Sequence, residues 1–269
     1  MKKSTIVILS IVVLISAIAV YLLVANKKNS ENSAQTGDLK VGYQLEKPAN
    51  GEEIATIQTN LGEMKMRFFP EAAPKAVENF KTLASKGYYD NVIFHRVIKN
   101  FMIQSGDPTG TGTGGESIWN KNFEDEFSKS LFNITGAVAM ANRGRNTNGS
   151  QFFINYQDPK EFIGWDEFEK SYEEYKKGPR KFTMTYGKTI DMSKITDEIK
   201  NLYTENGGSP SLDGYYSTAK EGHTVFAQVF EGLETVNKIS NVETNPQDNR
   251  PLEDVKIEKI TFSGYQSEN

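Results

Sequence analysis

Short apolar runs, each closed by glycine, asparagine or aspartate, recur along this chain and limit the folds open to it. Two of them, Ile54–Thr59 and Glu63–Phe68, alternate apolar and polar residues on either side of the turn residues Asn60-Leu61-Gly62. Further runs follow at Val92–Ile98, Phe101–Gln104, Ala137–Ala141, Gln151–Asn155, Thr224–Phe230 and Val255–Phe262. Many short strands separated by turn signals predict a mainly β protein, and we expect a closed β-barrel.

Two other stretches have helical spacing. Pro74 stands where a first helical turn tolerates proline, and apolar residues then recur at three- and four-residue intervals until Gly87. A second helix is expected over Leu233–Ile239. In the final strand, Val255–Phe262, the alternation slips at Lys259, as a β-bulge would produce.

The 53 residues from 158 to 210 differ in character from the rest. Trp165, Phe168 and Tyr172 have helical spacing, a lysine-rich polar stretch follows, and a further helix is expected over Ser193–Tyr203. We interpret the whole segment as an inserted helical flap. Its charges are typical of a solvated face, and a dedicated binding surface is the alternative.

The N-terminal stretch is apolar enough to cross a membrane. From Ile6 to Ala25 only Ser10, Ser16 and Tyr21 are not aliphatic, and two lysines flank each side. At ~1.5 Å per residue, this length matches a hydrocarbon core of about 30 Å. We expect an anchor over residues 1–28, a flexible polar linker over 29–50 and one domain over 51–269. The domain is expected outside the cytoplasm on a single-pass membrane protein, with a cleaved signal peptide as the alternative.

Composition argues against several chemistries. Four of the 31 basic residues lie in residues 1–28, which leaves 27 against 35 acidic residues, so nucleic acid is not an expected partner. Absence of cysteine excludes thiolate ligands, and the two histidines lack His-Glu-x-x-His spacing, so no metal site is expected. Gly110 to Gly115 fits a dinucleotide fingerprint, but no helical pattern follows it. No cofactor is therefore expected.

Residues 94–107 form the first candidate site. Arg96, Phe101, Met102 and Gln104 place a cation, large apolar side chains and an amide within about one strand's reach. No nucleophile accompanies them, so the set suits non-covalent catalysis. On strand alternation, His95 points away from Arg96, and we assign it a structural role. A histidine-based hydrolase is disfavoured, because none of the nearby serines lies in a Gly-x-Ser-x-Gly elbow.

A second candidate wall is the loop over 141–150, which is rich in asparagine and glycine and leads directly into Gln151-Phe152-Phe153. Amide side chains and glycines can offer hydrogen-bonding groups to an extended ligand. An ordinary turn is the alternative. It does not explain why two strands with matching amide and aromatic residues both adjoin such loops.

These segments resemble the cyclophilin-type peptidyl-prolyl cis-trans isomerases. The motifs that carry the resemblance occur in family order over roughly Ile54 to Phe262, apart from the flap. They are Phe94-His95-Arg96, Phe101-Met102, Gln104-Ser105-Gly106-Asp107, Gly114-Gly115-Glu116-Ser117-Ile118, Phe123-Glu124-Asp125-Glu126, and Met140-Ala141-Asn142 through Phe153-Ile154. The resemblance implies an eight-stranded β-barrel capped by two helices.

The resemblance also implies roles for individual residues. Arg96, Phe101 and Gln104 would be the catalytic group, with Arg96 as the catalytic guanidinium. Met102 and Phe153 would complete a proline pocket with Phe101. The remaining residues would bind substrate: Ala141, Asn142, Gln151, Leu212 and His223.

Three departures from the family pattern stand out. Pro210-Ser211 replaces a tryptophan that often precedes Leu-Asp-Gly, which leaves cyclosporin binding open. Eight residues, Tyr215–Gly222, separate Gly214 from His223, which leaves the register of Leu212 open. Arg143 and Arg145 occupy a loop that more often carries small or neutral residues, and they would favour acidic neighbours of proline.

The sequence therefore predicts a peptidyl-prolyl cis-trans isomerase that acts on X-Pro bonds of unfolded or newly exported proteins at the outer face of the membrane. The alternative is a chaperone or partner-binding module with the same fold and little turnover.

Overall fold

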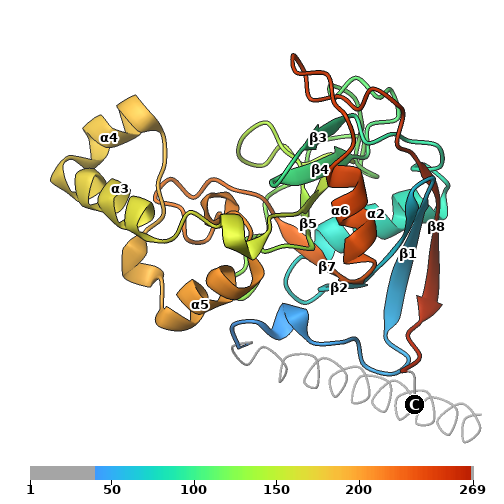
Figure 1. Ribbon diagram of the computed structural model, residues 1–269, viewed down its shortest axis with the longest axis horizontal. Helices are drawn as coiled ribbons and strands as arrows, with labels where there is room; N and C mark the ends of the chain where they lie inside the picture. Colours follow the sequence, from blue (N-terminus) through green and yellow to red (C-terminus); the bar gives the residue numbers. More distant parts are fainter. Residues whose placement is uncertain (1–39, 268–269) are drawn as a thin grey trace, which may run out of the picture. The chain divides into compact units, whose positions relative to one another are not determined.

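The computed structural model describes residues 40–267, and its centre is one curled antiparallel sheet of eight strands (Figure 1). The strands are β1 (Glu53–Thr59), β2 (Gly62–Phe68), β3 (Arg96–Ile98), β4 (Met102–Ser105), β5 (Ala137–Met140), β6 (Phe152–Asn155), β7 (Val225–Glu231) and β8 (Ile257–Gly264). Their order in the sheet is β3-β4-β6-β5-β7-β2-β1-β8. The prediction of eight short strands is confirmed, and residues 40–267 add five α-helices to the sheet.

Local sequence explains the first hairpin and the last strand. β1 and β2 pair antiparallel from Ile54 opposite Arg67 to Thr59 opposite Gly62, around the expected turn. Along β1 and β8 the register shifts where Thr59 pairs with Ile257 instead of Glu258. This shift is the bulge expected beside Lys259.

The sheet's edges meet through short backbone contacts. Phe94 N–H donates to Val255 O at 2.8 Å, and Ile257 N–H donates to Val92 O at 2.9 Å. These bonds join the segment before β3 to the start of β8, but β3 and β8 share no ladder of their own within residues 40–267. The expected closed barrel is thus a curled eight-stranded sheet whose edges touch over a few residues.

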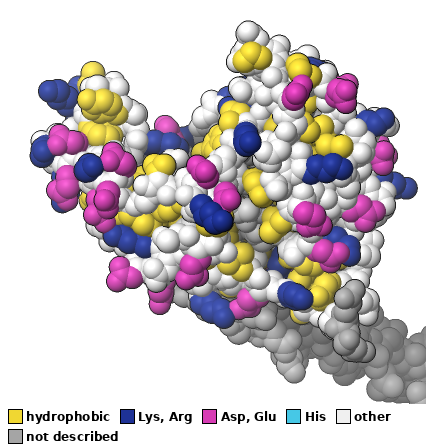
Figure 2. All heavy atoms as spheres, in the orientation of Figure 1, with side chains coloured by type: hydrophobic (Ala, Val, Ile, Leu, Met, Phe, Trp, Pro, Cys, Tyr) yellow, Lys and Arg dark blue, Asp and Glu magenta, His cyan; other side chains and the backbone are white. Residues whose placement is uncertain are grey.

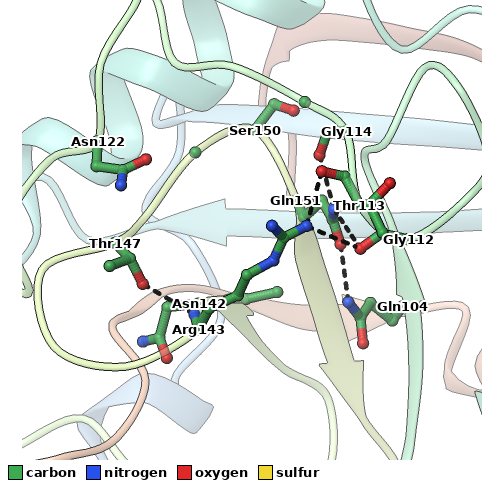
Figure 3. Close-up of a pocket in the computed structure, with 13 residues that line it drawn as sticks. Gln104, Gly112, Thr113, Gly114, Asn122, Asn142, Arg143, Thr147, Ser150 and Gln151 are labelled. Atoms are coloured by element: carbon green, nitrogen blue, oxygen red, sulfur yellow. Dashed lines mark hydrogen bonds between the residues drawn. The ribbon is translucent and has the colours of Figure 1, made fainter.

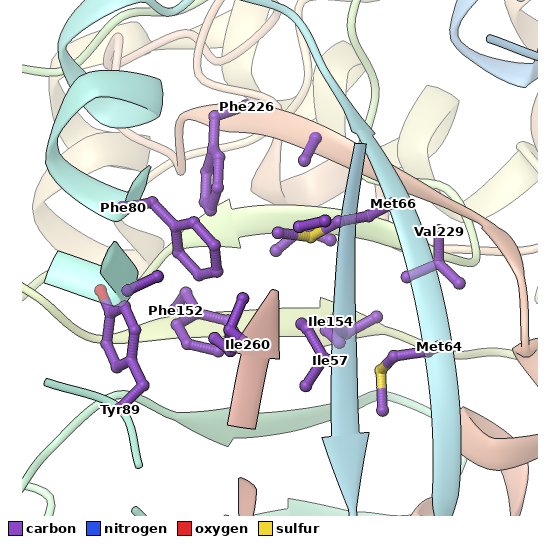
Figure 4. Close-up of a cluster of buried hydrophobic side chains, with 14 of the residues drawn as sticks. Ile57, Met64, Met66, Phe80, Tyr89, Phe152, Ile154, Phe226, Val229 and Ile260 are labelled. Atoms are coloured by element: carbon purple, nitrogen blue, oxygen red, sulfur yellow. The ribbon is translucent and has the colours of Figure 1, made fainter. Parts of the chain in front are cut away.

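Side chains on one face of the curl form the core, with α2 (Pro74–Ser85) across it. Figure 4 shows Phe80 of α2 among Tyr89, Phe152 and Phe226, and their ring centroids lie 5.2 to 5.4 Å from that of Phe80. The second expected helix, α6 (Leu233–Ser240), contacts β2 and β4. Both helices are confirmed at their expected positions.

The N-terminus of α2 receives its hydrogen-bond partner from a distant segment. The backbone N–H groups of Lys75 and Ala76 donate to the Glu126 carboxylate at 3.1 and 3.0 Å. A carboxylate there satisfies amides that have no intrahelical acceptor and complements the helix dipole. The contact ties α2 to the chain segment that leads toward the candidate site.

The segment over 158–210 is helical, as expected, and has a core of its own. Its helices are α3 (Asp166–Lys177), α4 (Pro179–Tyr186) and α5 (Asp197–Asn206). The helix expected over 193–203 begins later, because Thr196 caps α5 by accepting from Ile199 N–H at 3.3 Å. The lysine-rich stretch also contains α4, which the sequence analysis missed. Trp165 and Tyr203 from this segment pack with Phe132 in a second buried cluster.

Part of the predicted flexible linker, residues 29–50, packs against the domain, because Tyr43, Gln44 and Pro48 are buried. Gln44 is fully buried, and its side chain donates to Phe132 O at 3.0 Å and to Gln228 Oε1 at 2.9 Å. The linker prediction is therefore wrong for Tyr43 and Gln44, because these side chains are buried against the domain and Gln44 forms its hydrogen bonds with buried groups rather than with water. The expected anchor lies outside the described residues. No helix between residues 40 and 267 has the length and apolar character needed to cross a bilayer.

Candidate active site

Strand pairing brings residues from the two candidate segments into one row. Arg96 of β3 pairs with Gln104 of β4, which in turn pairs with Phe153 of β6. Paired residues of an antiparallel sheet point to the same face, and their sequence neighbours point to the other. Those neighbours, Val97 and Ile103 among them, lie in the hydrophobic core. Alternation therefore places Arg96, Gln104 and Phe153 together on the face opposite the core.

A chain of hydrogen bonds holds the polar members of the row in place. An Arg96 guanidinium N–H donates to Gln104 Oε1 at 3.3 Å, and Gln104 Nε2 donates to Gln151 Oε1 at 2.9 Å. Gln151 Nε2 donates in turn to the carbonyl oxygens of Gly112 and Gly114 at 3.2 and 2.8 Å. The two amides are thereby oriented by backbone carbonyls. Partial burial lowers the pKa of Arg96, yet an arginine remains a cation at neutral pH.

Apolar groups adjoin this row. Met102 and Phe153 are buried, and the ring of His223 stands edge-on to Phe153 with centroids 5.0 Å apart. His223 Nδ1 lies 2.9 Å from Met140 O, and a carbonyl can only accept, so Nδ1 carries the proton. Burial lowers the pKa of His223 and favours the neutral ring. The imidazole thus acts as a fixed, uncharged wall.

The backbone of Leu212 contacts that of His223 despite the eight residues between Gly214 and His223. The backbone N–H of His223 donates to Leu212 O at 2.9 Å. The neighbouring Asp213 is buried and accepts at 2.9 Å from both the backbone and the side-chain amide of Asn133, and also from the hydroxyl of Tyr203 in α5. Burial raises the pKa of Asp213 to about 6. The inserted segment therefore helps to fix the loop that carries Leu212.

Phe101 lies in the turn just before β4 and is half-buried. Its backbone N–H donates to Ile98 O at 3.1 Å, and its carbonyl accepts from Tyr156 N–H at 3.0 Å. These bonds fix the turn next to Met102. The structure thus places Phe101 at the end of β4 that lies farther from Gln104.

A pocket of about 220 Å³ opens beside the row, between two loops (Figure 3). Gln104, Ala141, Asn142 and Gln151 line it, which brings four of the expected residues together. The other expected residues are not part of its lining: Arg96, Phe101, Met102, Phe153, Leu212 and His223. The candidate site thus has a polar part and an adjoining apolar part.

The second wall of this pocket is the glycine-rich segment over 110–115, for which the sequence predicts only a turn. Gly115 has φ +94°, and a Cβ there would lie 2.2 Å from Ser150 Oγ, so only glycine fits. Asp107 anchors the turn by accepting from the backbone N–H groups of Thr109 and Gly114 at 2.8 and 3.0 Å. An aspartate before a run of glycine and threonine was the available signal. Thr147 lines the pocket from the 141–150 loop, which the sequence predicts as a wall, whereas Asn122 lines it without any signal in the sequence.

Arg143 closes one side of the pocket. Its guanidinium donates to the carbonyl oxygens of Thr113 and Gly112 at 2.7 and 3.3 Å, and Figure 3 shows it reaching across from the 141–150 loop. Asn142 Nδ2 donates to Gly222 O at 2.8 Å on the other side of that loop. Arg145 is exposed. The loop is therefore held between the glycine-rich turn and the segment that precedes His223.

His95 lies on the opposite face from Arg96, as expected, and is only 7% exposed. Its ring packs beneath Gly112, and neither ring nitrogen has a hydrogen-bond partner among residues 40–267. The hydroxyls of Ser105 and Ser150 donate to backbone carbonyls of Ile93 and Gly106 at 2.9 and 2.6 Å. His95 therefore activates neither serine, and this geometry disfavours the hydrolase hypothesis.

Known proteins are similar to this chain over most of its length. The family model for the cyclophilin type peptidyl-prolyl cis-trans isomerase/CLD matches residues 54–262. Proteins of Staphylococcus saprophyticus and Staphylococcus aureus strain COL, both named for peptidyl-prolyl cis-trans isomerase activity, are each 44% identical over 81% of this chain and 95% of their own length. A crystal structure of a Cryptosporidium parvum cyclophilin type peptidyl-prolyl cis-trans isomerase covers 80% of this chain and 99% of its own, with 30% identity and a TM-score of 0.56. The chain therefore belongs to the cyclophilin-type peptidyl-prolyl cis-trans isomerases, enzymes that interconvert the cis and trans forms of X-Pro peptide bonds.

Proposed function

We propose that Arg96, Phe101 and Gln104 form the catalytic group, with Phe153 next to Gln104 as part of the proline pocket, and that this group acts on proline-containing segments of exported proteins. The observation that carries this proposal is the meeting of a half-buried guanidinium, held by Gln104, with the apolar wall of Phe153 and His223. In this proposal Met102, Phe153, Leu212 and His223 hold the proline ring. Ala141, Asn142 and Gln151 hold the flanking peptide.

The chemistry requires no covalent step. Resonance gives the peptide C–N bond double-bond character and a rotation barrier of about 18 to 20 kcal/mol. In the twisted transition state the prolyl nitrogen becomes pyramidal and its lone pair is localised. Arg96, by donating a hydrogen bond to that nitrogen, stabilises the twisted state more than either planar isomer.

The surroundings of Arg96 make this interaction available. Gln104 Oε1 occupies one N–H of the guanidinium, and the chain through Gln151 to Gly112 and Gly114 fixes Gln104 itself. The remaining donors are thereby aimed without reorganisation at the moment of reaction. Apolar side chains at the adjoining wall bind the proline ring and remove the polar planar amide from water. Loss of this hydration reduces the free-energy difference between the planar amide and the less polar twisted amide.

The proposed location rests on sequence alone. The apolar stretch Ile6–Ala25 has the length of a membrane anchor, and an anchored, acidic domain of this family suits folding of newly exported chains. Protease added to intact cells should digest the domain and leave cytoplasmic proteins whole. Survival of the domain under protease would contradict the extracytoplasmic proposal. The N-terminal mass of the purified protein shows whether the N-terminal segment has been cleaved as a signal peptide.

The catalytic proposal is tested with the purified full chain and a chromogenic X-Pro peptide. Arg96→Ala should lower kcat/KM about 100-fold or more, because a preorganised donor to the transition state is commonly worth that factor. Arg96→Lys should recover only part of the rate, since an ammonium lacks the planar fork that Gln104 holds.

Arg67→Ala is the matched control for loss of a half-buried arginine. Arg67 lies on β2, away from the candidate site, and its guanidinium pairs with the Glu52 carboxylate at 3.0 Å. Its alanine variant should therefore be less stable but keep the wild-type kcat/KM. Full activity of Arg96→Ala would contradict the role given to Arg96. An intact chain that binds the peptide and leaves the uncatalysed rate unchanged would favour the alternative of a binding module.

A further inference from the structure

The inserted segment carries a cleft that the isomerase site does not use. It has a volume of about 690 Å³ and lies between α3 and α4, which Figure 1 shows as a helical pair to one side of the curled sheet. One wall is the face of α3 that carries Glu167, Lys170 and Glu174. The other is the face of α4 that carries Lys181, Phe182 and Tyr186, and Lys188 follows at its end.

The charges of this cleft are unbalanced. Lys170 pairs with Glu167 at 2.7 Å, and Lys177 pairs with Glu174, so both carboxylates of the lining are neutralised within the α3 side. Lys181 and Lys188 remain without a carboxylate partner among the residues of the lining. Residues 175–190 contain five lysines and arginines and no acid, although the part of the chain after residue 28 is acidic as a whole. The cleft is thus a local basic site on an acidic protein.

Apolar surface accompanies the charge. Phe182 is buried against Tyr175 and Tyr186, with ring centroids 5.7 and 5.1 Å away. Tyr186 and Met184 nevertheless remain 72% and 80% exposed. Figure 2 shows hydrophobic side chains beside lysine and arginine side chains on the surface of this lobe. A ligand for this surface would therefore combine negative charge with apolar or aromatic groups.

The cleft connects to the candidate active site through three consecutive residues. Lys188 Nζ donates to Glu221 O at 2.8 Å, Asn142 Nδ2 donates to Gly222 O at 2.8 Å, and the next residue is His223. One end of the cleft thus contacts the same short segment that the proline pocket uses. A polypeptide held at the pocket can continue along this segment toward Lys181.

We propose that the α3–α4 cleft is a second subsite for the substrate chain and binds an acidic segment of the polypeptide whose proline occupies the active site. This proposal rests on the proposed function of that site. We infer an acidic segment because the cleft is basic. We infer the substrate chain rather than an unrelated partner because residues Glu221–His223 connect the cleft to the active site. Binding two linked subsites raises apparent affinity by making the second contact intramolecular.

The test uses the purified full chain and five synthetic peptides. One is a short X-Pro peptide, and four carry an extension of about ten residues, which spans at most roughly 36 Å. The extension contains either four glutamates or four glutamines, and each version is placed on the N-terminal or the C-terminal side of the proline. The Glu-extended peptide should have a KM about fivefold below that of the Gln-extended peptide on one of the two sides, since each exposed pair contributes little alone.

Lys181→Glu should reduce this ratio of KM values to about one. The substitution is compatible with α4, because a carboxylate in the first turn of a helix is favourable. Lys259→Glu is the matched control: Lys259 is an exposed lysine on β8, so the same change of net charge should leave the ratio at its wild-type value. Tyr186→Ser should weaken both extended peptides alike, because it removes apolar surface and no charge.

Fluorescence anisotropy of labelled extended peptides gives a readout that does not need turnover. Failure to accelerate any peptide, with a preserved Lys181-dependent preference in anisotropy, would overturn the proposed function and leave the subsite standing. Equal KM and equal anisotropy for the Glu and Gln peptides on the wild-type protein would overturn the subsite. Lys181-dependent binding to vesicles with anionic phospholipid, without any peptide preference, would also overturn it and assign the cleft to a lipid surface.

Discussion

At the scale of single residues, the two histidines illustrate how position decides chemistry. His223 has its Nδ1 proton fixed by Met140 O and stands against Phe153, so it is a neutral wall of the pocket. His95 is the neighbour of Arg96, but strand alternation buries it on the other side, beneath the glycine-rich turn. Only the arginine of that pair can meet a substrate.

Burial of His95 makes the stability of the protein depend on pH. Burial lowers the pKa of His95, while Asp107 opposes this effect and Arg250 and Arg96 reinforce it. Below the ordinary histidine pKa of about 6.5 the unfolded chain binds a proton that the folded chain does not. The free energy of unfolding should therefore fall as pH drops from about 7 to 5, by up to about 1.4 kcal/mol per pH unit from this residue.

Urea unfolding of the wild type and of His95→Gln measures this contribution. His223 and Asp213 titrate in both proteins, so the difference between the two pH curves reports His95 alone. The variant should show the shallower loss toward acid. If the two pH curves were parallel, His95 would bind its proton as readily in the folded state as in the unfolded state, which would contradict the lowered pKa.

At the scale of elements, the glycine-rich turn and the 141–150 loop are the two walls of the pocket, and they touch closely at its edge. Gly115 lies close to Ser150 Oγ, and Gly149 lies close to Gly115 O. A side chain at either glycine would displace the opposite wall. The hydrogen bonds of Arg143 span the same gap. The shape of the pocket therefore depends on contact between two loops that lie far apart in the sequence.

Gly115→Ala tests that dependence. The new Cβ would meet Ser150 Oγ, and overpacking of this kind costs about 1 to 3 kcal/mol. We expect kcat/KM for an X-Pro peptide to fall about tenfold as the wall shifts. Gly51→Ala is the control, because Gly51 also has a positive φ, +81°, but has no atom within 4 Å of the added Cβ. Equal losses of activity in both variants would attribute the effect to backbone strain rather than to the wall.

At the scale of the whole molecule, contacts between distant segments hold the sheet, the insertion and residues 40–50 together. Gln44 bonds to Phe132 and Gln228, and Tyr203 of α5 bonds to Asp213 beside the pocket. The first contact ties the start of the domain to β7. The second ties the insertion to the loop of Leu212, so the inserted segment contributes to the site's framework as well as to its surface.

Truncation measures the contribution of residues 40–50. A chain that begins at Lys47 loses the buried hydrogen bonds of Gln44 and the ring contact of Tyr43 with Phe69, whose centroids lie 5.3 Å apart. We expect a loss on the order of 3 kcal/mol, which lowers Tm by roughly 6 to 12 °C. A chain that begins at Lys40 is the control and should melt at the higher temperature. Identical Tm values would restore the linker interpretation of these residues.

Sequence by itself determined the parts of this protein that depend on local periodicity. Alternation located the strands and placed Arg96 and His95 on opposite faces, helical spacing located α2 and α6, and the ordered motifs identified the family. The strands, the helices and the two faces follow from the geometry of a few consecutive residues, whereas the family follows from the resemblance of its motifs. The signals were weakest in the insertion, where polar lysine-rich residues form α4 around a single buried phenylalanine, Phe182.

Only the tertiary structure decided what meets across long sequence separations. The meeting of Leu212 with His223, the pocket wall over 110–115, the burial of Gln44 and the α3–α4 cleft all depend on which distant groups satisfy one another's hydrogen bonds and fill one another's space. From the sequence alone, a polar residue such as Gln44 is predicted to be solvent-exposed. It becomes part of the interior because Phe132 and Gln228, which lie 88 and 184 positions away, offer partners that water would otherwise supply.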